Sequence, residues 1–205
     1  MKTTVVTTTI ISLASLMLVG CSDAANTLPK TQAPFLIDGV CDEDAWDQTP
    51  HFDIGGGATL DWLQDENYLY MCLSITEGSY GTFDLYYLDP SDGQPVDLHV
   101  SAQIGERKLV DGVWPDYLWW NNTAWTANNI EMQYTDNKRS GFVEPAGHEL
   151  QANLLKLAND KGEITLMLHV RALMSEDGTR SGNTAWPNGA KVDDPATWTT
   201  LHVTR

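Results

Sequence analysis

Short runs of alternating apolar and polar residues dominate the chain beyond its first fifty residues. In Tyr68–Thr76, apolar side chains occupy every second position, and the same period of two recurs in Phe83–Leu88, Val96–Ala102 and Ile164–Val170. Successive side chains of a strand point to opposite faces, so each run predicts a β-strand with one buried face. Trp198–Val203 predicts a last short strand.

Turn-forming residues separate these runs, as in Asp89–Gly93. Only Asp42–Trp46 and Leu154–Ala158 predict short helical turns, and the longest stretches expected to be irregular are Asp111–Asn129 and Ser175–Thr197. Many short strands without alternating helices predict an all-β fold, an antiparallel two-sheet β-sandwich.

The first twenty residues have the pattern of an export signal. Lys2 is followed by an uncharged stretch from Thr3 to Gly20, most apolar at its end. Leu18-Val19-Gly20-Cys21 resembles the lipobox of bacterial lipoproteins. We therefore expect residues 1–20 to be a signal peptide and Cys21 to carry the lipid.

The residues after Cys21 are polar and include Pro29, which predicts a flexible tether over residues 21–33 and one folded domain over residues 34–205. Multiple acyl chains would anchor the protein to a membrane. Ser22 after the cysteine favours the outer membrane by resemblance to enteric sorting rules, so we expect a lipid-anchored, periplasm-facing protein of the cell envelope.

Charge and cysteine content narrow the possible partners. With 28 acidic and 12 basic residues, the chain has a net charge of −16, which argues against nucleic acid as a ligand. It also argues against a basic contact with anionic lipid. Cys41 and Cys72 remain after lipidation and can form a disulfide in an oxidising periplasm, or remain as buried thiols.

One segment resembles a known family. Leu36–Trp46, with the sequence LIDGVCDEDAW, is similar to the opening of the family 9 carbohydrate-binding modules and their DOMON-like relatives. Leu60–Tyr70 and Gly147–Leu150 resemble later strands of the same family, and the resemblance extends over Pro34–Val203. Ala152-Asn153 departs from the usual isoleucine-proline pair.

The resemblance implies a jelly-roll-like sandwich that binds carbohydrate without catalysis, often with structural calcium. The wider superfamily also contains domains that bind haem b, so the fold follows from the resemblance more safely than the ligand does.

Sugar binding requires exposed aromatic rings beside polar side chains that bond the hydroxyl groups. Trp46 is expected in the core, whereas the aromatic cluster Trp114–Trp125 predicts either a stacking platform or a hydrophobic plug at one end of the sandwich. Trp186 is expected to form an opposing wall. The predicted stacking residues are Tyr117, Trp119, Trp120, Trp125 and Trp186.

Polar partners are expected on strands beside these loops, namely Asp84, Glu131, Glu149 and Arg171. For Arg171 the alternative is a structural salt bridge, and for Glu149 a purely structural role.

Calcium needs six to eight oxygen ligands. The turn with Asp89, Asp92 and Asp97 is one candidate site, and a second group of acids lies near the first strand: Asp38, Asp42, Glu43 and Asp61. The alternative is that both groups are solvated turns.

Three other functions are weighed against sugar binding. The sequence has none of the G-x-S-x-G, H-E-x-x-H or phosphate-loop motifs, so we do not expect an enzyme. A haem b electron-transfer domain would need axial ligands. The candidates are Met71, Met132, Met167, His148 and His169. An envelope protein that binds a protein partner through its aromatic loop is the third alternative.

Overall fold

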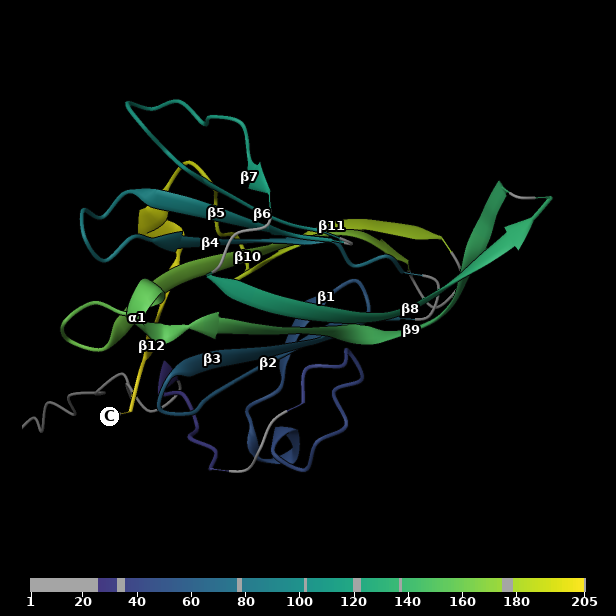
Figure 1. Cartoon of the computed structure of the whole chain (residues 1–205), viewed down its shortest axis with the longest axis horizontal. Coiled ribbons are helices and arrows are strands. Elements are labelled where there is room, and N and C mark those ends of the chain that lie inside the picture. The colour runs from purple at the N-terminus through teal and green to yellow at the C-terminus, as the bar shows by residue number, and fades with distance from the viewer. Residues whose placement is uncertain are drawn as a thin grey trace, which may run out of the picture.

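The computed structural model describes residues 26–32, 36–76, 79–101, 103–119, 123–136, 138–174 and 179–204 (Figure 1). Within these residues the strands form two sheets, of five and seven strands, and every ladder between two strands is antiparallel. The predicted all-β sandwich is confirmed. No helix in the described ranges is long and apolar enough to cross a membrane.

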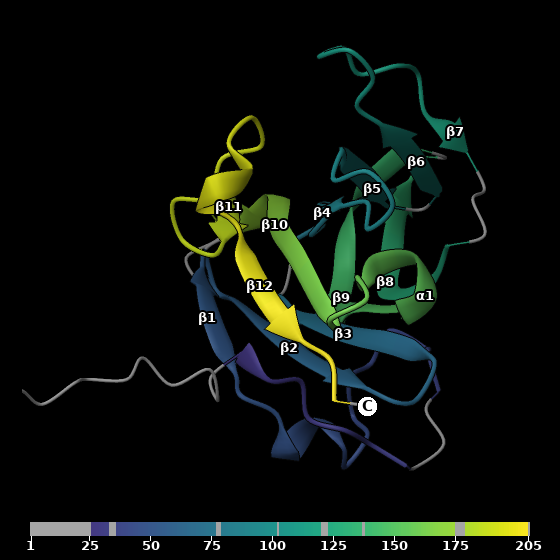
Figure 2. The same cartoon turned by 90° about the vertical axis from the view of Figure 1, so that its left-hand side faces the viewer.

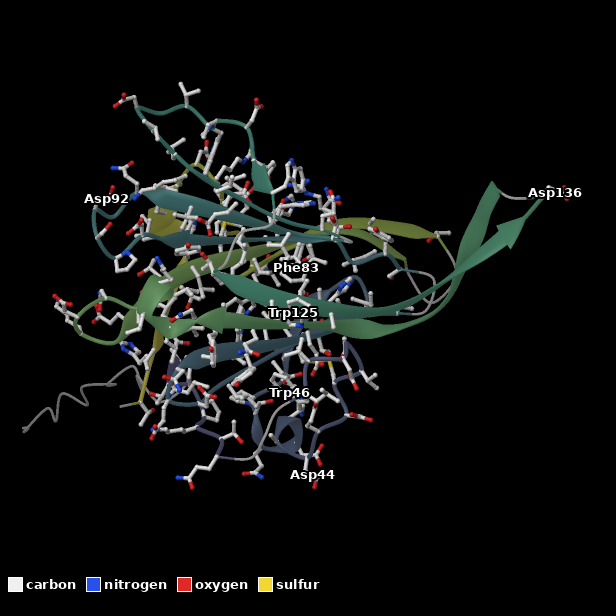
Figure 3. All side chains as sticks on the ribbon, viewed as in Figure 1. Asp44, Trp46, Phe83, Asp92, Trp125 and Asp136 are labelled. Carbon is white, nitrogen blue, oxygen red and sulfur yellow. A yellow bond between two sulfur atoms is a disulfide. The ribbon has the colours of Figure 1, made fainter. Side chains whose placement is uncertain are left out.

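The five-stranded sheet has, in spatial order, β1 (Phe52–Gly55), β2 (Ala58–Gln64), β3 (Tyr68–Ser74), β9 (Lys138–Asn153) and β8 (Ala124–Thr135). Strands β8 and β9 form a long hairpin that extends beyond the body of the sandwich, with Asp136 at its tip (Figure 3).

The seven-stranded sheet runs in the order β11 (Arg180–Trp186), β10 (Glu163–Met174), β4 (Phe83–Leu88), β5 (Pro95–Val100), β6 (Ile104–Lys108) and β7 (Leu118–Trp119). The remaining strand, β12 (Thr199–His202), also pairs with β10.

The core lies between the two sheets, which Figure 2 shows as an upper layer with β10 and β4 and a lower layer with β2 and β3. Each sheet contributes its alternating apolar positions. Leu69 and Met71 come from β3, and Phe83, Leu85 and Tyr87 come from β4. These residues are fully or almost fully buried, and each such side chain stabilises the fold by about 1.5–3 kcal/mol.

The second predicted helical turn exists in a form one residue shorter, whereas the first is displaced towards the C-terminus. The α1 helix (Leu154–Leu157) is capped by the Asn153 side chain, which accepts a hydrogen bond from the Leu155 amide. A single turn of 3-10 helix, η2 (Trp46–Gln48), starts where the predicted first turn ends. A second, η3 (Pro195–Thr197), precedes β12.

The sequence interpretation was wrong in two regions expected to be irregular. Ala124–Asn129 belongs to β8 and Arg180–Trp186 is β11. Both strands lie at the edge of a sheet and pair along one side only. An edge strand need not bury a full apolar face, so neither segment carries the alternation that reveals central strands.

The segment expected as a flexible tether begins to pack on the domain at Thr27, which bridges to His202. Leu28 is buried in the main core, and its amide donates to the His202 carbonyl. The Gln64 amide donates to the Pro29 carbonyl. The expectation of a tether through residue 33 is therefore wrong for these residues, because one apolar side chain and three backbone bonds fix the segment.

Candidate functional site

Charged and aromatic side chains are grouped together on the outer face of the seven-stranded sheet. One row across the strands contains His169, Asp84, His99, Gly105 and Trp119, each directly opposite the next. These residues alternate along their strands with the core positions. The strand pairing therefore brings together residues from five strands on one surface.

A second row on the same face, two residues further along each strand, contains Met167, Tyr86, Asp97 and Arg107. Its centre is aromatic, because Tyr86 contacts Trp114 at a ring distance of 6.0 Å. The second row thus joins the same surface to the long loop before β7.

The two carboxylates of this face are completely buried and are held by cations. Asp84 accepts from Arg171 and from His99 Nδ1, at 2.6 Å for the latter. Asp97 accepts from Arg107 Nε at 2.8 Å and from the Tyr117 hydroxyl at 2.7 Å. The register of the sheet places Asp84 opposite His99 and Asp97 opposite Arg107.

Burial shapes the proton affinity of these groups. Desolvation raises the pKa of Asp97 against the hydrogen bonds from Tyr117 and Arg107, and the nearby Asp84 carboxylate raises it further. Burial also lowers the pKa of His169, and the positive charge of Arg171 adds to this effect. The face is a tightly coupled network of polar groups.

An aromatic platform lies at the β7 end of the face. The rings of Tyr117 and Trp119 are 5.2 Å apart, and His99 meets the edge of Trp119 at 5.9 Å. The guanidinium of Arg107 lies 4.2 Å above the Tyr117 ring. Trp119 is 44% exposed and Tyr117 is half-buried, so Trp119 is the part of the platform that is open to solvent.

The structure separates the other predicted stacking residues from this platform. Trp125 is 66% exposed but lies opposite Gln151 on the outer face of the five-stranded sheet, away from Trp119. Trp186 is buried in the core against Phe52 and Trp62, so the expected opposing wall was wrong. Trp120 lies outside the described residues, as do Cys21 and the side chain of Glu131.

Trp186 was misplaced because a glycine-rich segment looked like an open loop. In β11, Trp186 pairs with the core residue Leu168 and therefore points inward. Its ring fills the space between the sheets, where burial of a large aromatic side chain is favourable.

Glu149 is structural. It is fully buried, and its Oε2 accepts from the amides of Asp38 and Gly39, both at 2.9 Å. The Trp46 indole donates to Oε1 at 3.2 Å. Burial raises the pKa of Glu149 against these bonds. The carboxylate thereby holds the loop that carries Trp46 against the five-stranded sheet, and Figure 3 shows Trp46 on that side.

A disulfide between Cys41 and Cys72 also ties this loop to the sheet. Of the two alternatives left open by the sequence, a disulfide or two buried thiols, the structure has the disulfide. Trp46 packs there with Leu63 and Tyr70, in a small apolar cluster outside the main core. The family-like N-terminal motif therefore covers the five-stranded sheet, opposite the candidate face.

The predicted calcium ligands do not gather around one point. Asp89 and Asp92 accept from the ammonium of Lys108 at 2.6 and 2.9 Å, whereas Asp97 bonds to Arg107. The described residues contain no group of three or more histidine, cysteine or acidic side chains that could hold a metal ion. Lysine and arginine side chains thus pair with these carboxylates at separate points, and the donor set does not fit calcium.

The second predicted group of calcium ligands, the acids near the first strand, likewise forms no metal-binding cluster among the described residues. Asp61 bonds to Thr49 and His51, and Glu43 accepts from the Trp46 indole.

The haem candidates are engaged in the fold. Met71 and Met167 are buried in apolar clusters, and His148 Nε2 lies 2.9 Å from the Tyr80 carbonyl oxygen. His169 shares a strand face with Met167, two residues away, which does not place them on opposite sides of a ring. The side chain of Met132 lies outside the described part of the structure.

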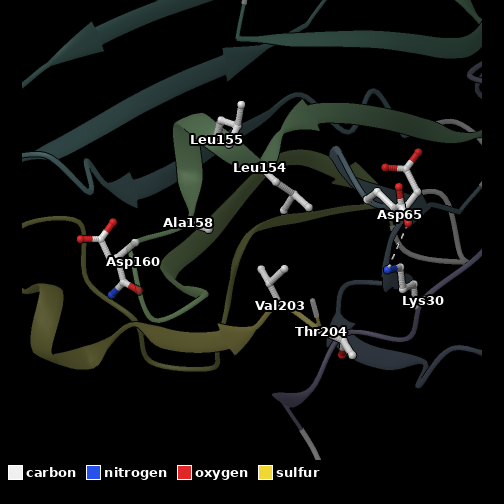
Figure 4. Close-up of a pocket in the computed structure, with 10 residues that line it drawn as sticks. Lys30, Asp65, Leu154, Leu155, Ala158, Asp160, Val203 and Thr204 are labelled. Carbon is white, nitrogen blue, oxygen red and sulfur yellow. Dashed lines mark ion pairs between the residues drawn. The ribbon is translucent and has the colours of Figure 1, made fainter.

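A groove of about 520 Å³ lies at the end of the sandwich near the C-terminus (Figure 4). Leu154, Ala158 and Val203 form its apolar side, and Lys30 and Asp65 contribute to its polar side. None of its lining residues is aromatic, so it offers no stacking surface. The exposed aromatic ring that lies beside charged groups is on the seven-stranded sheet instead.

Sequence reasoning missed His99, Arg107 and Gly105. The available signal was the polar half of each alternating run. Asp84, Asp97 and His99 interrupt strands whose other face is entirely apolar.

No protein-family model matches the sequence, and no curated protein is significantly similar. A family 9 carbohydrate-binding module from Caldicellulosiruptor kristjanssonii, solved in complex with cellotriose, has a TM-score of 0.50 and 11% identity, over 87% of this chain and 93% of that chain. A Bacteroides uniformis protein described as a candidate carbohydrate-binding protein has a TM-score of 0.50 and 9% identity, over 87% of this chain and 98% of that chain. Identities this low establish a shared fold, and the chain accordingly has the two-sheet fold of the family 9 carbohydrate-binding modules.

Proposed function

We propose that this protein is a non-catalytic carbohydrate-binding module that holds an oligosaccharide on the outer face of its seven-stranded sheet. The observation that carries the proposal is the exposed Trp119, packed against the half-buried Tyr117 and beside the polar side chains of His99 and Arg107. Apolar faces of sugar rings stack on such platforms, and planar polar groups bond the hydroxyls. The solved structure with cellotriose supports the same class of ligand.

The two exposed tryptophans provide a matched test. Trp119 belongs to the proposed face, whereas Trp125 lies on the outer face of the opposite sheet. Titration calorimetry against a panel of oligosaccharides is expected to show binding that Trp119→Ala weakens at least about tenfold and Trp125→Ala leaves within twofold. Loss in Trp125→Ala alone would overturn the assignment to this face, and an absence of binding to every glycan would overturn the function.

Two further properties belong to the proposal. The module releases its ligand unchanged, which chromatography of the glycan after prolonged incubation tests. It is also anchored through a lipid on Cys21 and faces the periplasm, most favourably from the outer membrane, as the lipobox-like sequence supports. Labelled palmitate should enter the full-length protein in its bacterial host and be absent from Cys21→Ala, and membrane fractionation should place the label in the outer membrane.

A further inference from the structure

In both arginine–aspartate ion pairs of the candidate face, the carboxylate lies deeper in the protein than the guanidinium. The carboxylates of Asp84 and Asp97 have no exposed surface, whereas the side chains above them are 42% exposed for Arg171 and 24% for Arg107. Each pair therefore lies with its negative end inside the protein and its positive end toward solvent. His99, which also contacts Asp84, is partly exposed on the same side.

The exposed charge of these pairs is positive, whereas the net charge of the chain is negative. The sequence has a net charge of −16, yet both acids in the two cross-strand rows are buried, and the charged groups that reach the surface above them are the guanidinium groups of Arg107 and Arg171. Exposed guanidinium groups above buried counter-charges attract an anionic group more strongly than a neutral hydroxyl.

The two arginines differ in how their guanidinium groups are already bonded and in how far they are exposed. Arg107 directs both Nε and a terminal nitrogen at one Asp97 oxygen and covers the rings of Tyr117 and Trp114. Arg171 meets Asp84 through one terminal nitrogen and is the more exposed of the two. A guanidinium has five N–H donors in a planar fork that matches a carboxylate.

Arg171 and the platform are joined by a short chain of contacts. Trp119 meets His99, His99 bonds to one oxygen of Asp84, and Arg171 bonds to the other. The strands that carry Arg171 and Trp119, β10 and β7, are four strand spacings apart, or roughly 19 Å, and His99 and Asp84 lie between them. A sugar ring stacked on Trp119 and a group held by Arg171 therefore belong to different residues of one oligosaccharide.

We propose that the glycan is acidic and that Arg171 binds the carboxylate of a uronic acid residue in it, while a neighbouring residue stacks on Tyr117 and Trp119. The inference rests on the proposed sugar-binding function and specifies its ligand class.

The test compares three oligosaccharides of equal length by titration calorimetry: oligogalacturonate, its methyl ester, and cellotriose. We expect oligogalacturonate to bind about tenfold more tightly than either neutral ligand, in the range of a charge-assisted hydrogen bond. Raising the salt concentration should weaken only the acidic ligand. Arg171→Gln should remove the preference, Arg171→Lys should retain part of it, and the distant Lys30→Gln should leave it unchanged.

The outcomes separate the two proposals. Equal or tighter binding of the neutral ligands would overturn the acidic assignment and leave sugar binding intact. Equal binding of a sulfated galactan would overturn the choice of a carboxylate. If no ligand binds, or if Trp119→Ala has no effect on any of them, the proposed function fails as well. Thermal unfolding of each variant identifies those that lose binding only because they no longer fold.

Discussion

The indole ring of Trp119 lies directly against the backbone of Gly105. A Cβ atom at Gly105 would be 2.8 Å from the ring of Trp119 and 3.2 Å from that of Tyr117. The φ angle of Gly105 is one that other residues adopt, so what the position requires is space rather than backbone freedom. The platform is exposed because a glycine beneath it lets two rings rest on the sheet.

Gly105→Ala should therefore displace Trp119 and weaken sugar binding about tenfold, with little loss of stability, because the clash is with an exposed side chain. A double-mutant cycle checks the mechanism. Gly105→Ala should cost nothing further in a Trp119→Ala background. Additive losses in the double variant would show that the glycine acts by another route.

Leu28→Ala should destabilise the domain by about 2–3 kcal/mol, since it removes a buried side chain from the core. Leu36→Ala is the matched control, because Leu36 is largely exposed and should change stability by less than about 0.5 kcal/mol. Urea unfolding measures both. Equal stability of the two variants would contradict the packing of the N-terminal segment.

Reduction of the disulfide between Cys41 and Cys72 should lower the free energy of unfolding by about 3–4 kcal/mol, because the bond closes a sequence separation of 31 residues. Sugar affinity should be unchanged while the domain remains folded, since the bond lies on the opposite sheet. Urea unfolding with and without reductant, and for Cys41→Ala/Cys72→Ala, gives the size of the effect. A fall in affinity of the folded, reduced protein would show that the two faces are coupled.

Stability should fall as the pH is lowered below about 6.5. Burial lowers the pKa of His148 below its ordinary value of 6.5, so the unfolded chain binds this proton more tightly than the folded chain. The full contribution is present above pH 6.5 and is lost as the pH falls toward the folded pKa. The same sign holds for His169, whose pKa burial also lowers.

Urea unfolding at pH 7.5, 6.5 and 5.5 should show this loss, with a slope of at most about 1.4 kcal/mol per pH unit for each histidine. His148→Gln and His169→Gln should each flatten the profile. The raised pKa values of Asp97 and Glu149 act oppositely, since their folded forms retain protons more readily as the pH falls. A stability that rises steadily from pH 7.5 to 5.5 would contradict the dominance of the histidines.

The central strands were predictable because their residues satisfy local and global requirements together. Leu69 and Met71 occupy alternate positions of their strand, and both are buried in the core between the sheets as the alternation demands. Edge strand β11 was not predictable in this way, because its neighbours in space, rather than its own pattern, place Trp186 in the core.

The candidate site was predictable only in part. Tyr117, Trp119 and Arg171 were identified by residue type, but their grouping depends on which strands are adjacent. Trp125 is close to Trp119 in sequence, but the two residues belong to strands of different sheets, β8 and β7. Asp84 and Asp97 were assigned to different sites by the sequence, and only the strand pairing shows that both lie beneath cations on one face.

The packing of residues 27–31 also limits how far the domain can travel. From Cys21 to Asn26 there are five residue steps, or at most about 18 Å of extended chain. With a lipid on Cys21, this short connection would hold the sandwich close to the bilayer and keep it from reaching far into the periplasm. Its ligand would then be a polymer at the envelope surface or one delivered there, and local concentration at the membrane would compensate for modest affinity.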